Sequence, residues 1–373
     1  MKLCLLILVI CMTSCTSNIT VDSGICTRIN LDEVDDTVSV FDIFSDIQVI
    51  PLEITDSSVL AYVDFYDIKN DTLYILDSKQ NDIFIFQLNG TFIKKLDYKG
   101  NGPGEYVRIT DMNINRFTGN LEVLSADGRI LVYDSSGNHF LYQINLPSYL
   151  IHSFQNVTSD TDILYFDSKK DDALQLYSRK ENRIIATTWK VPEALSFSGF
   201  LPTKPFYIFQ DSLFLYKGYS GETFTVLPQN PILQPSHSWD FDTHNFDVTT
   251  IPADQGWKYY QNLYMNGSAN QALGFVLNAE NKHYYMTQFR YKNEDKILFY
   301  DKIKKKKKLF HTFQEGFGIY FQHVDNEYIT LICYYDYLSK FINPNVLDDK
   351  NRKCLFSITE ESNPFILRFK FKS

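Results

Sequence analysis

The chain repeats a unit in which short apolar segments alternate with polar turns. Each unit contains an apolar segment, a polar turn and a second apolar segment, which is the pattern of antiparallel hairpins. The first two units add an Asn-Gly or Ser-Gly turn before a third segment. The units start about 40 to 50 residues apart, with one longer gap, and this period is typical of a β-propeller. The unit starts are Asp71, Gly119, Thr161, Asp211, Lys282 and Glu327.

Several of the apolar segments, such as 73–76, 83–86 and 130–133, are apolar at consecutive rather than alternating positions. Each sheet is therefore expected to be covered on both faces, as blades are when they pack around an axis. We predict an all-β fold, a six-bladed β-propeller with four-stranded antiparallel blades. Residues 39–54 have strand character and are expected to close the ring by completing the last blade, with strands from 354–358 and 365–371.

The most glycine-rich segment, 99–106, predicts a sharp corner rather than a phosphate-binding loop. A phosphate-binding loop requires a helix whose first N–H groups point at the phosphate, whereas a strand-like segment follows here. Pro103 sets φ for the second position of a tight turn, and Gly104 can take the positive φ that a type II turn requires next. We predict that Gly102, Pro103 and Gly104 form a turn between two sheets.

Segments 44–53, 73–96 and 99–115 resemble the six-bladed β-propeller lipoproteins of Bacteroidetes, which are similar to NHL-repeat propellers. The family's units carry a G-x-G-P-G-x-F corner followed by a strand; in this chain Tyr106 stands in place of Phe, and one copy of the corner is present. The resemblance covers most of the mature chain. It implies the fold and a location in the cell envelope, and it assigns no catalytic residue and no cofactor.

The N-terminus has the features of a bacterial lipoprotein signal. An apolar run, 3–10, follows Lys2 and is too short to span a bilayer as a mature helix. Residues 12–15, Met-Thr-Ser-Cys, resemble a lipobox in which Cys15 is lipidated and becomes the new N-terminus, although Met12 replaces the usual Leu. The alternative is a secreted protein cleaved nearby, or an uncleaved anchor.

This signal divides the chain into three parts. We expect residues 1–15 to be the signal peptide, 16–38 to be a polar tether, and 39–373 to form the propeller. The expected location is the outer membrane, with the propeller facing the periplasm and attached to the membrane through its lipid.

The net charge argues against one class of partner, and the cysteine content argues against a fold held by disulfides. The formal net charge of −9 provides no positive surface for phosphates, so a nucleic acid partner is not expected. Outside the signal only Cys26, Cys333 and Cys354 remain, and three cysteines cannot form a disulfide framework. Cys333 lies in an apolar run and is expected to be a buried thiol.

A metal site is one candidate for chemistry. Asp240, Asp242 and His244 alternate along an expected extended segment, so their side chains would share one face and could bind a metal ion. A solvated strand face explains the same pattern.

One pair of carboxylates and one run of lysines could each have a functional or only a structural role. Glu105 and Asp111 could form an acid/base pair, but they flank one corner rather than opposite sides of a cleft. The lysines at 304–308 lie between strand-like segments, where lysines commonly protect a sheet edge from pairing. Binding to an anionic lipid or polymer is the alternative for this run.

We therefore expect a non-catalytic binding module that presents one rim of loops to a protein, peptide or glycan. The segment 228–267 departs most from the repeat, and its aromatic residues could contact a ligand or cap the core of an irregular blade. The alternative function is a metal-dependent envelope hydrolase or lyase of the gluconolactonase type, with a metal at the propeller axis. The candidate contact residues are Trp239, Trp257, Tyr259 and Tyr260.

Overall fold

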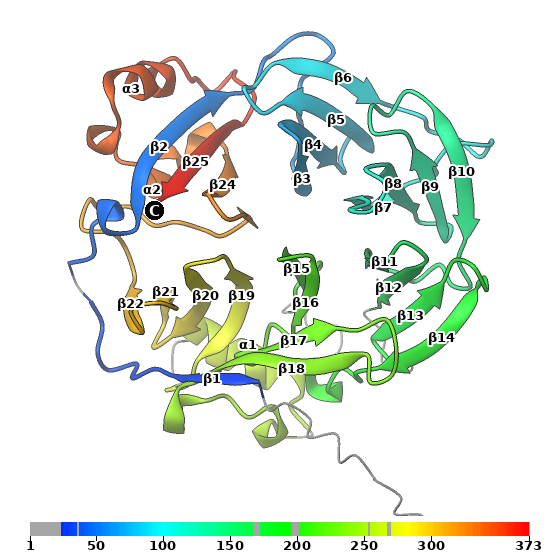
Figure 1. The fold of residues 1–373 in the computed structure, drawn as a ribbon. Coiled ribbons are helices and arrows are strands. Elements are labelled where there is room, and N and C mark those ends of the chain that lie inside the picture. Colours follow the sequence, from blue (N-terminus) through cyan, green and yellow to red (C-terminus); the bar gives the residue numbers. More distant parts are fainter. Residues whose placement is uncertain are drawn as a thin grey trace, which may run out of the picture.

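Six antiparallel sheets surround a common axis like the blades of a propeller (Figure 1). The computed structural model describes residues 24–35, 37–166, 172–195, 201–252, 254–266 and 270–372. Five sheets have four strands each, and the sheet of blade four carries a fifth strand at its outer edge. The predicted six-bladed propeller is therefore confirmed.

Blades one to five follow the chain from the axis outward, so their first strand is innermost (Figure 1). Blade one contains β3 (Phe65–Lys69), β4 (Thr72–Asp77), β5 (Asp82–Gln87) and β6 (Phe92–Leu96). Blade two contains β7 (Ile109–Ile114), β8 (Leu121–Ser125), β9 (Arg129–Tyr133) and β10 (Phe140–Asn145). Blade three contains β11 (Ser153–Thr158), β12 (Thr161–Tyr165), β13 (Leu174–Ser178) and β14 (Arg183–Thr188).

Blade four contains β15 (Phe206–Phe209), β16 (Ser212–Tyr216), β17 (Glu222–Val226) and β18 (Leu233–Asp240), with β1 (Ile25–Arg28) as its fifth strand. Blade five contains β19 (Leu273–Glu280), β20 (Tyr284–Tyr291), β21 (Glu294–Asp301) and β22 (Lys306–Phe310). Blade six contains β23 (His323–Val324), β24 (Tyr328–Cys333), β25 (Phe365–Phe371) and β2 (Phe44–Pro51).

The sequence repeat marks the second strand of every blade. Each predicted unit start lies at, or up to about two residues before, the first residue of β4, β8, β12, β16, β20 or β24. The innermost strands stand outside the repeat because they border the axis on one edge and carry mixed polar and apolar residues, such as the sequence FYDIK of β3.

Buried apolar side chains of the described residues form six clusters, one between each pair of neighbouring blades. The cluster between blades one and two, for example, joins Leu76 and Ile85 of blade one to Met112 and Leu131 of blade two. Every blade contributes to two clusters, which explains why its middle strands are apolar at consecutive positions.

Blade six is built from both ends of the chain. Its outermost strand, β2, pairs antiparallel with β25 from Phe44 opposite Phe371 to Pro51 opposite Phe365. The predicted closure of the ring by residues 39–54 is therefore confirmed. This closure removes the unpaired edge that the last blade would otherwise expose.

The prediction of a strand at 354–358 was wrong. Most of this segment belongs to α3 (Asp349–Phe356), a helix whose N-cap Asp348 accepts a hydrogen bond from the Asn351 N–H. The Asn351 side chain also accepts the Val49 N–H of β2 at 2.9 Å, so the helix is fixed against the closing strand. A short apolar run does not show whether it forms a helix or a strand, because it has no clear periodicity. The N-cap at Asp348 favours the helix here.

The range predicted to be a tether, 16–38, includes an ordered part. β1 pairs parallel with β18, with Ile25 opposite His237 and Arg28 opposite Asp240. The chain then follows the outer edge of blade five, where the Asp35 N–H donates to the Leu309 carbonyl at 2.7 Å. Residues 25–35 therefore form a strand and then cover a sheet edge, because the outer edges of blades four and five have unpaired backbone N–H and C=O groups.

The lysine run meets this N-terminal segment. Lys307 donates to the backbone carbonyls of Asn30 and Glu33, and Lys308 pairs with Asp42 at 2.9 Å. The run thus lies at the outer edge of blade five and holds the segment that covers that edge.

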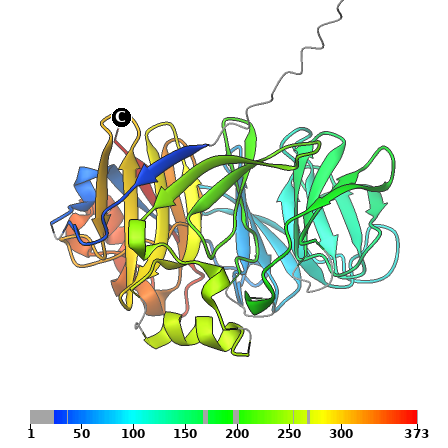
Figure 2. The same ribbon diagram turned by 90° about the horizontal axis from the view of Figure 1, so that it is seen from below.

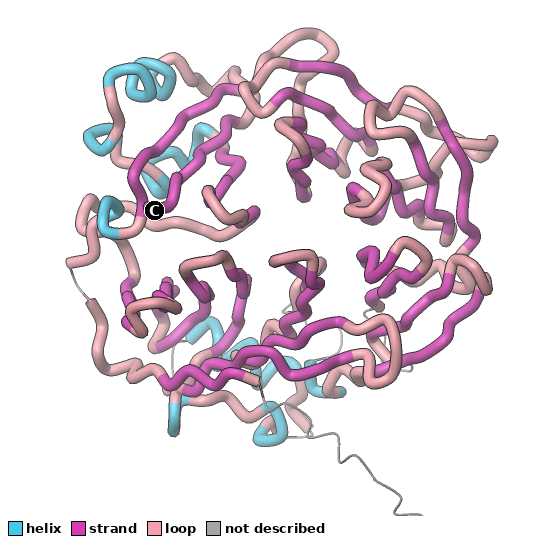
Figure 3. The backbone as a smooth tube through the Cα atoms, in the orientation of Figure 1, coloured by secondary structure: helices cyan, strands magenta, loops and turns pink. Residues whose placement is uncertain are grey.

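The helices lie at the rim or on one face of the ring of strands, mainly beside blades four to six (Figures 2 and 3). The α-helices are α1 (Trp257–Asn266), α2 (Leu338–Phe341) and α3, and the 3-10 helices are η1 (Val40–Asp42), η2 (Glu193–Leu195), η3 (Asp242–His244), η4 (Val248–Thr250), η5 (Tyr335–Tyr337) and η6 (Pro344–Val346). None of the helices in the described ranges is long and apolar enough to cross a membrane.

The ring has two distinct ends. We call the end where the innermost strands begin the loop face, because it carries the connections between blades and those between second and third strands. The opposite end, the hairpin face, carries tight turns such as Asn70-Asp71 between β3 and β4, where both residues have positive φ. Figure 2 shows α1 projecting from one face while β1 lies toward the other.

The predicted corner is confirmed as the connection from blade one to blade two. The Glu105 N–H donates to the Gly102 carbonyl at 3.1 Å, and Gly104 has a φ of 76°, as a type II turn around Pro103 requires. Tyr106 is fully buried, and its hydroxyl donates to the Leu96 carbonyl at 2.9 Å.

Replacing Gly104 with Val is expected to destabilise the fold, because positive φ is strained for a β-branched residue at about 1–3 kcal/mol. A Cβ at this position would also lie 2.7 Å from Cγ of Phe140. Gly119→Val is the matched control, since Gly119 has the same φ of 76° but nothing within 4 Å of its added Cβ. Urea unfolding should show the larger loss for Gly104→Val; equal losses would mean that the Phe140 contact has no effect.

Candidate ligand-binding pocket

The aromatic residues predicted to contact a ligand are divided by burial. Trp239 is 5% exposed and packs against the His237 ring, while Tyr260 is fully buried and its hydroxyl accepts the Gly274 N–H. Trp239 and Tyr260 therefore do not contact a ligand, because their side chains are buried. They belong to the core, which was the alternative interpretation of these aromatic residues. Tyr259 is half-buried, and Trp257 is exposed on α1.

The predicted metal ligands do not share the face of an extended segment. Asp240 ends β18, and its carboxylate accepts the N–H of Asp242 and a side-chain N–H of Asn245, which turns the chain into η3. Asp240 also pairs with Arg28 at 2.9 Å, and Nδ1 of His244 lies 2.7 Å from the Asn270 carbonyl oxygen. Across the described ranges, no three His, Cys, Asp or Glu side chains gather as a metal site would require.

The predicted acid/base pair and the cysteines lie at separate places in the fold. Glu105 accepts the Gly102 N–H inside the corner, while Asp111 is buried and pairs with Lys204, so the two carboxylates do not act together. Cys333 is a buried thiol, as predicted, and burial raises its pKa. Cys26 and Cys354 are also free. Cys15 lies outside the described residues.

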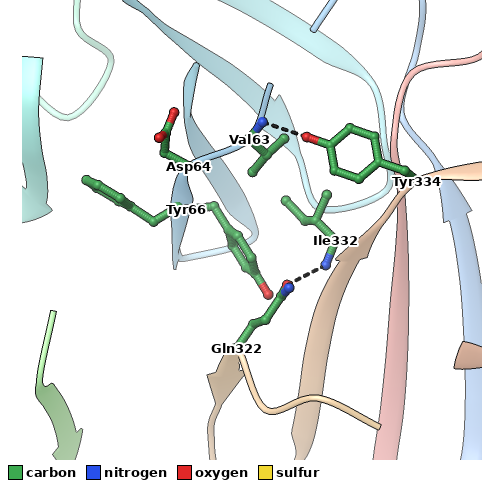
Figure 4. A pocket seen from close by; sticks show the side chains of 7 residues that line it. Val63, Asp64, Tyr66, Gln322, Ile332 and Tyr334 are labelled. Atoms are coloured by element: carbon green, nitrogen blue, oxygen red, sulfur yellow. Dashed lines mark hydrogen bonds between the residues drawn. The ribbon is translucent and has the colours of Figure 1, made fainter. Parts of the chain in front are cut away.

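A pocket of about 230 Å³ lies at the seam between blade one and blade six (Figure 4). Its walls come from the start of β3, from Gln322 just before β23 and from the end of β24, which places it at the loop face. The lining residues are Val63, Asp64, Phe65, Tyr66, Gln322, Ile332 and Tyr334.

Hydrogen bonds across the seam shape this pocket. The Val63 N–H of blade one donates to the Tyr334 hydroxyl at 2.6 Å (Figure 4). The Tyr66 hydroxyl donates to the Thr330 carbonyl of blade six, also at 2.6 Å. Burial raises the pKa of Tyr66 well above its ordinary value, so this hydroxyl stays protonated and keeps its donor role. The pocket is therefore formed before any ligand arrives.

Lys204 reaches the neighbourhood of the pocket from the opposite side of the axis. It precedes β15 of blade four, which faces β3 across the ring (Figure 1). Its ammonium lies 3.0 Å from Oδ1 of Asp111 and 5.0 Å from the centre of the Phe65 ring. Burial raises the pKa of Asp111, and Lys204 opposes that rise. This ion pair joins blades two and four beside the pocket.

Sequence reasoning missed the pocket because five of its seven lining residues fall outside the repeat; only Ile332 and Tyr334 belong to a predicted unit, the one that starts at Glu327. Residues 63–66 precede the first predicted unit, and Gln322 precedes the last one. A search for polar and aromatic residues just before each unit start would have pointed to them, since innermost strands begin there.

Comparison with known proteins identifies one family model and similar solved structures. A family model described as "Domain of unknown function (DUF4934)" matches residues 26–370. The crystal structure of a presumed exported protein from Bacteroides fragilis is similar with a TM-score of 0.75 and 20% identity, covering 94% of this chain and 99% of that one. A DUF4221 family member from Bacteroides vulgatus matches with a TM-score of 0.49 and 10% identity over 88% of this chain and 97% of its own. None of the curated proteins matches the chain.

Proposed function

The chain belongs to the DUF4934 family, a six-bladed propeller family of Bacteroidetes, and from this premise we propose that it is a non-catalytic binding module of the cell envelope whose ligand occupies the pocket between blades one and six. The observation that carries the proposal is a preformed concave site, lined by aromatic rings and a few polar groups, at the face where the long connections gather.

The surroundings of the pocket support this role. The connection between β24 and β25 contains η5, α2, η6 and α3, and it lies at the loop face. Tyr335 and Tyr337 of this connection are 41% and 49% exposed, and Tyr62, next to the lining residue Val63, is 45% exposed. Exposed tyrosines beside a pocket provide rigid contact area for a larger ligand or partner.

We further propose that Cys15 carries the lipid that holds the protein at the outer membrane. The similar Bacteroides fragilis protein is described as exported, which supports a location outside the cytoplasm. Since β1 runs parallel to β18, the chain enters it from the hairpin face, so an anchored propeller would present its pocket away from the membrane. Incorporation of labelled palmitate that persists in Cys15→Ala would contradict the anchor.

The binding role can be tested by filling the pocket. Val63→Phe is expected to reduce the binding of envelope-derived glycan or peptide fractions at least about tenfold, because the larger side chain occupies the space that a ligand group needs. Isothermal titration of the detergent-solubilised protein measures this. Val276→Phe, at a 52% exposed position on the innermost strand of blade five, is the matched control and should bind as the wild type does.

Unchanged binding in a folded Val63→Phe variant would place the ligand elsewhere. Hydrolysis of gluconolactone above the spontaneous rate by the same preparation would instead favour the enzyme alternative.

A further inference from the structure

Three polar groups of the pocket keep unused hydrogen-bonding capacity. Oε1 of Gln322 accepts the Ile332 N–H at 2.9 Å, which orients the amide and leaves both N–H groups of Nε2 without an acceptor among the described residues (Figure 4). The Tyr334 hydroxyl accepts the Val63 N–H, and its own proton has no acceptor in the described part of the chain. One oxygen of Asp64 accepts the Ser78 N–H, and the other has no such donor there.

Charge in the pocket disfavours an anionic ligand. Asp64 is the only charged side chain among the lining residues, and no cation is among them. The nearest ammonium described above, that of Lys204, is already paired with Asp111. A phosphate or carboxylate would therefore meet a like charge without a compensating partner.

The unused donors also disfavour a cationic ligand. An ammonium group could pair with Asp64, but it has no lone pair to accept from Gln322 or Tyr334. A ligand that covers these donors without accepting from them removes their hydrogen bonds to water, and each donor left unpaired in this way would weaken binding about tenfold. Hydroxyl groups suit all three groups, because a hydroxyl can donate to the carboxylate and can also accept from the amide or the phenol.

The walls and the size of the pocket suit a small ring. Rings of Phe65, Tyr66 and Tyr334, with the aliphatic Val63 and Ile332, supply apolar surface on which the C–H face of a sugar can pack. The volume of about 230 Å³ is below the roughly 300–1,000 Å³ of pockets for drug-sized ligands, and so corresponds to one ring.

We infer that the ligand group in this pocket is a single neutral sugar residue of a glycan. The inference rests on the proposed function, since it names the ligand class for the same pocket. A hydroxylated ring is the one class among those considered that uses the free oxygen of Asp64, the amide of Gln322 and the hydroxyl of Tyr334 together.

The test is saturation-transfer NMR of the detergent-solubilised protein with small probes that differ in charge. Methyl β-D-glucopyranoside, methyl β-D-galactopyranoside and methyl N-acetyl-β-D-glucosaminide are the neutral probes, methyl β-D-glucuronide is the anionic probe, and n-butylammonium is the cationic probe. At least one neutral glycoside is expected to bind, and the glucuronide and the ammonium at least about tenfold more weakly.

Two near-isosteric variants identify the groups involved. Gln322→Glu keeps an oxygen for the Ile332 N–H but removes both free donors, so binding of the neutral glycoside should fall about tenfold or more. Gln143→Glu, an exposed position on β10, is the control and should change nothing. Asp64→Asn should reduce the discrimination against the glucuronide, because it removes the like charge.

The outcomes separate the inference from the proposed function. If n-butylammonium or a deglycosylated peptide fraction binds in a Gln322-dependent manner while the three neutral glycosides do not, the sugar inference is overturned and the pocket remains the ligand site. If no probe binds and Val63→Phe leaves the binding of envelope fractions unchanged, both are overturned.

Discussion

Deleting residues 39–54 is expected to prevent the ring from folding as a monomer. The deletion removes β2, so β25 would lose its antiparallel partner and present an open edge. It also removes six buried apolar side chains, which contribute roughly 10 kcal/mol in total, the greater part of a stability of roughly 5–15 kcal/mol. These residues are Val40, Ile43, Phe44, Ile47, Val49 and Leu52.

Size-exclusion chromatography and thermal unfolding followed by circular dichroism measure this effect. Deleting residues 24–35, which removes β1 and the buried Ile29 and Leu31 but keeps the closure, is the control; it should lower the transition temperature yet leave a monomer with a cooperative transition. Single substitutions give a milder comparison. Phe44→Ala, at a fully buried position, should lower the free energy of unfolding by about 3–5 kcal/mol. Phe41→Ala, at a 40% exposed position, should lower it very little. A cooperative, monomeric 39–54 deletion would contradict closure by β2.

Replacing Arg179 with Met is the second change that we expect to lower the stability of the fold strongly. Arg179 lies between blades two and three and pairs with Glu122 and Asp162 at 2.7 Å each, and both carboxylates are 0% exposed. Burial by itself lowers the pKa of Arg179. The hydrogen bonds and charges of the two carboxylates outweigh burial, so the pKa of Arg179 is raised. Removing this cation leaves two buried carboxylates uncompensated, which should destabilise the fold by about 3–5 kcal/mol.

Neutralising the carboxylates should restore much of the loss, since the destabilisation comes from unpaired charge. The triple variant Arg179→Met, Glu122→Gln, Asp162→Asn is therefore expected to unfold at a higher urea concentration than Arg179→Met alone. Arg183→Met, which removes an exposed pair with Glu181, is the control and should change little.

The loss should also depend on pH. Burial raises the pKa of Asp162 above the ordinary 3.8 even with Arg179 present, and removing Arg179 raises it further. Above pH 3.8 the folded variant then holds more protons than the unfolded chain, so its stability falls as pH rises. Urea unfolding should show a smaller loss for Arg179→Met near pH 5 than near pH 8. Equal losses at both values would mean that the carboxylates tolerate their charge without Arg179.

The number of blades, the closing strand and the corner could be predicted from the sequence because each depends on local or periodic chemistry. Segments such as 73–76 are apolar at every position since both faces of a blade are covered, and this is visible without any tertiary information. The Pro103-Gly104 pair carries its own φ preferences, so the turn type follows from residue identity alone.

Other features depended on contacts that no local pattern reveals. Whether Trp239 faces solvent or the core was decided by the neighbouring blade, whose Phe275 and Phe289 join it in one buried cluster. The segment 354–358 was apolar enough for a strand, and the cap at Asp348 together with the Asn351 contact to β2 made most of it a helix instead.

The sequence alone therefore determined the architecture of this protein, whereas only the tertiary structure decided where its candidate site lies. The hydrogen bonds that shape the pocket join Val63 to Tyr334 and Tyr66 to Thr330, which are 271 and 264 residues apart in the chain. Such pairs meet only because β2 closes the ring and brings the last blade against the first. Periodicity reports which residues form strands, but the juxtaposition of the first and last blades is a property of the closed ring.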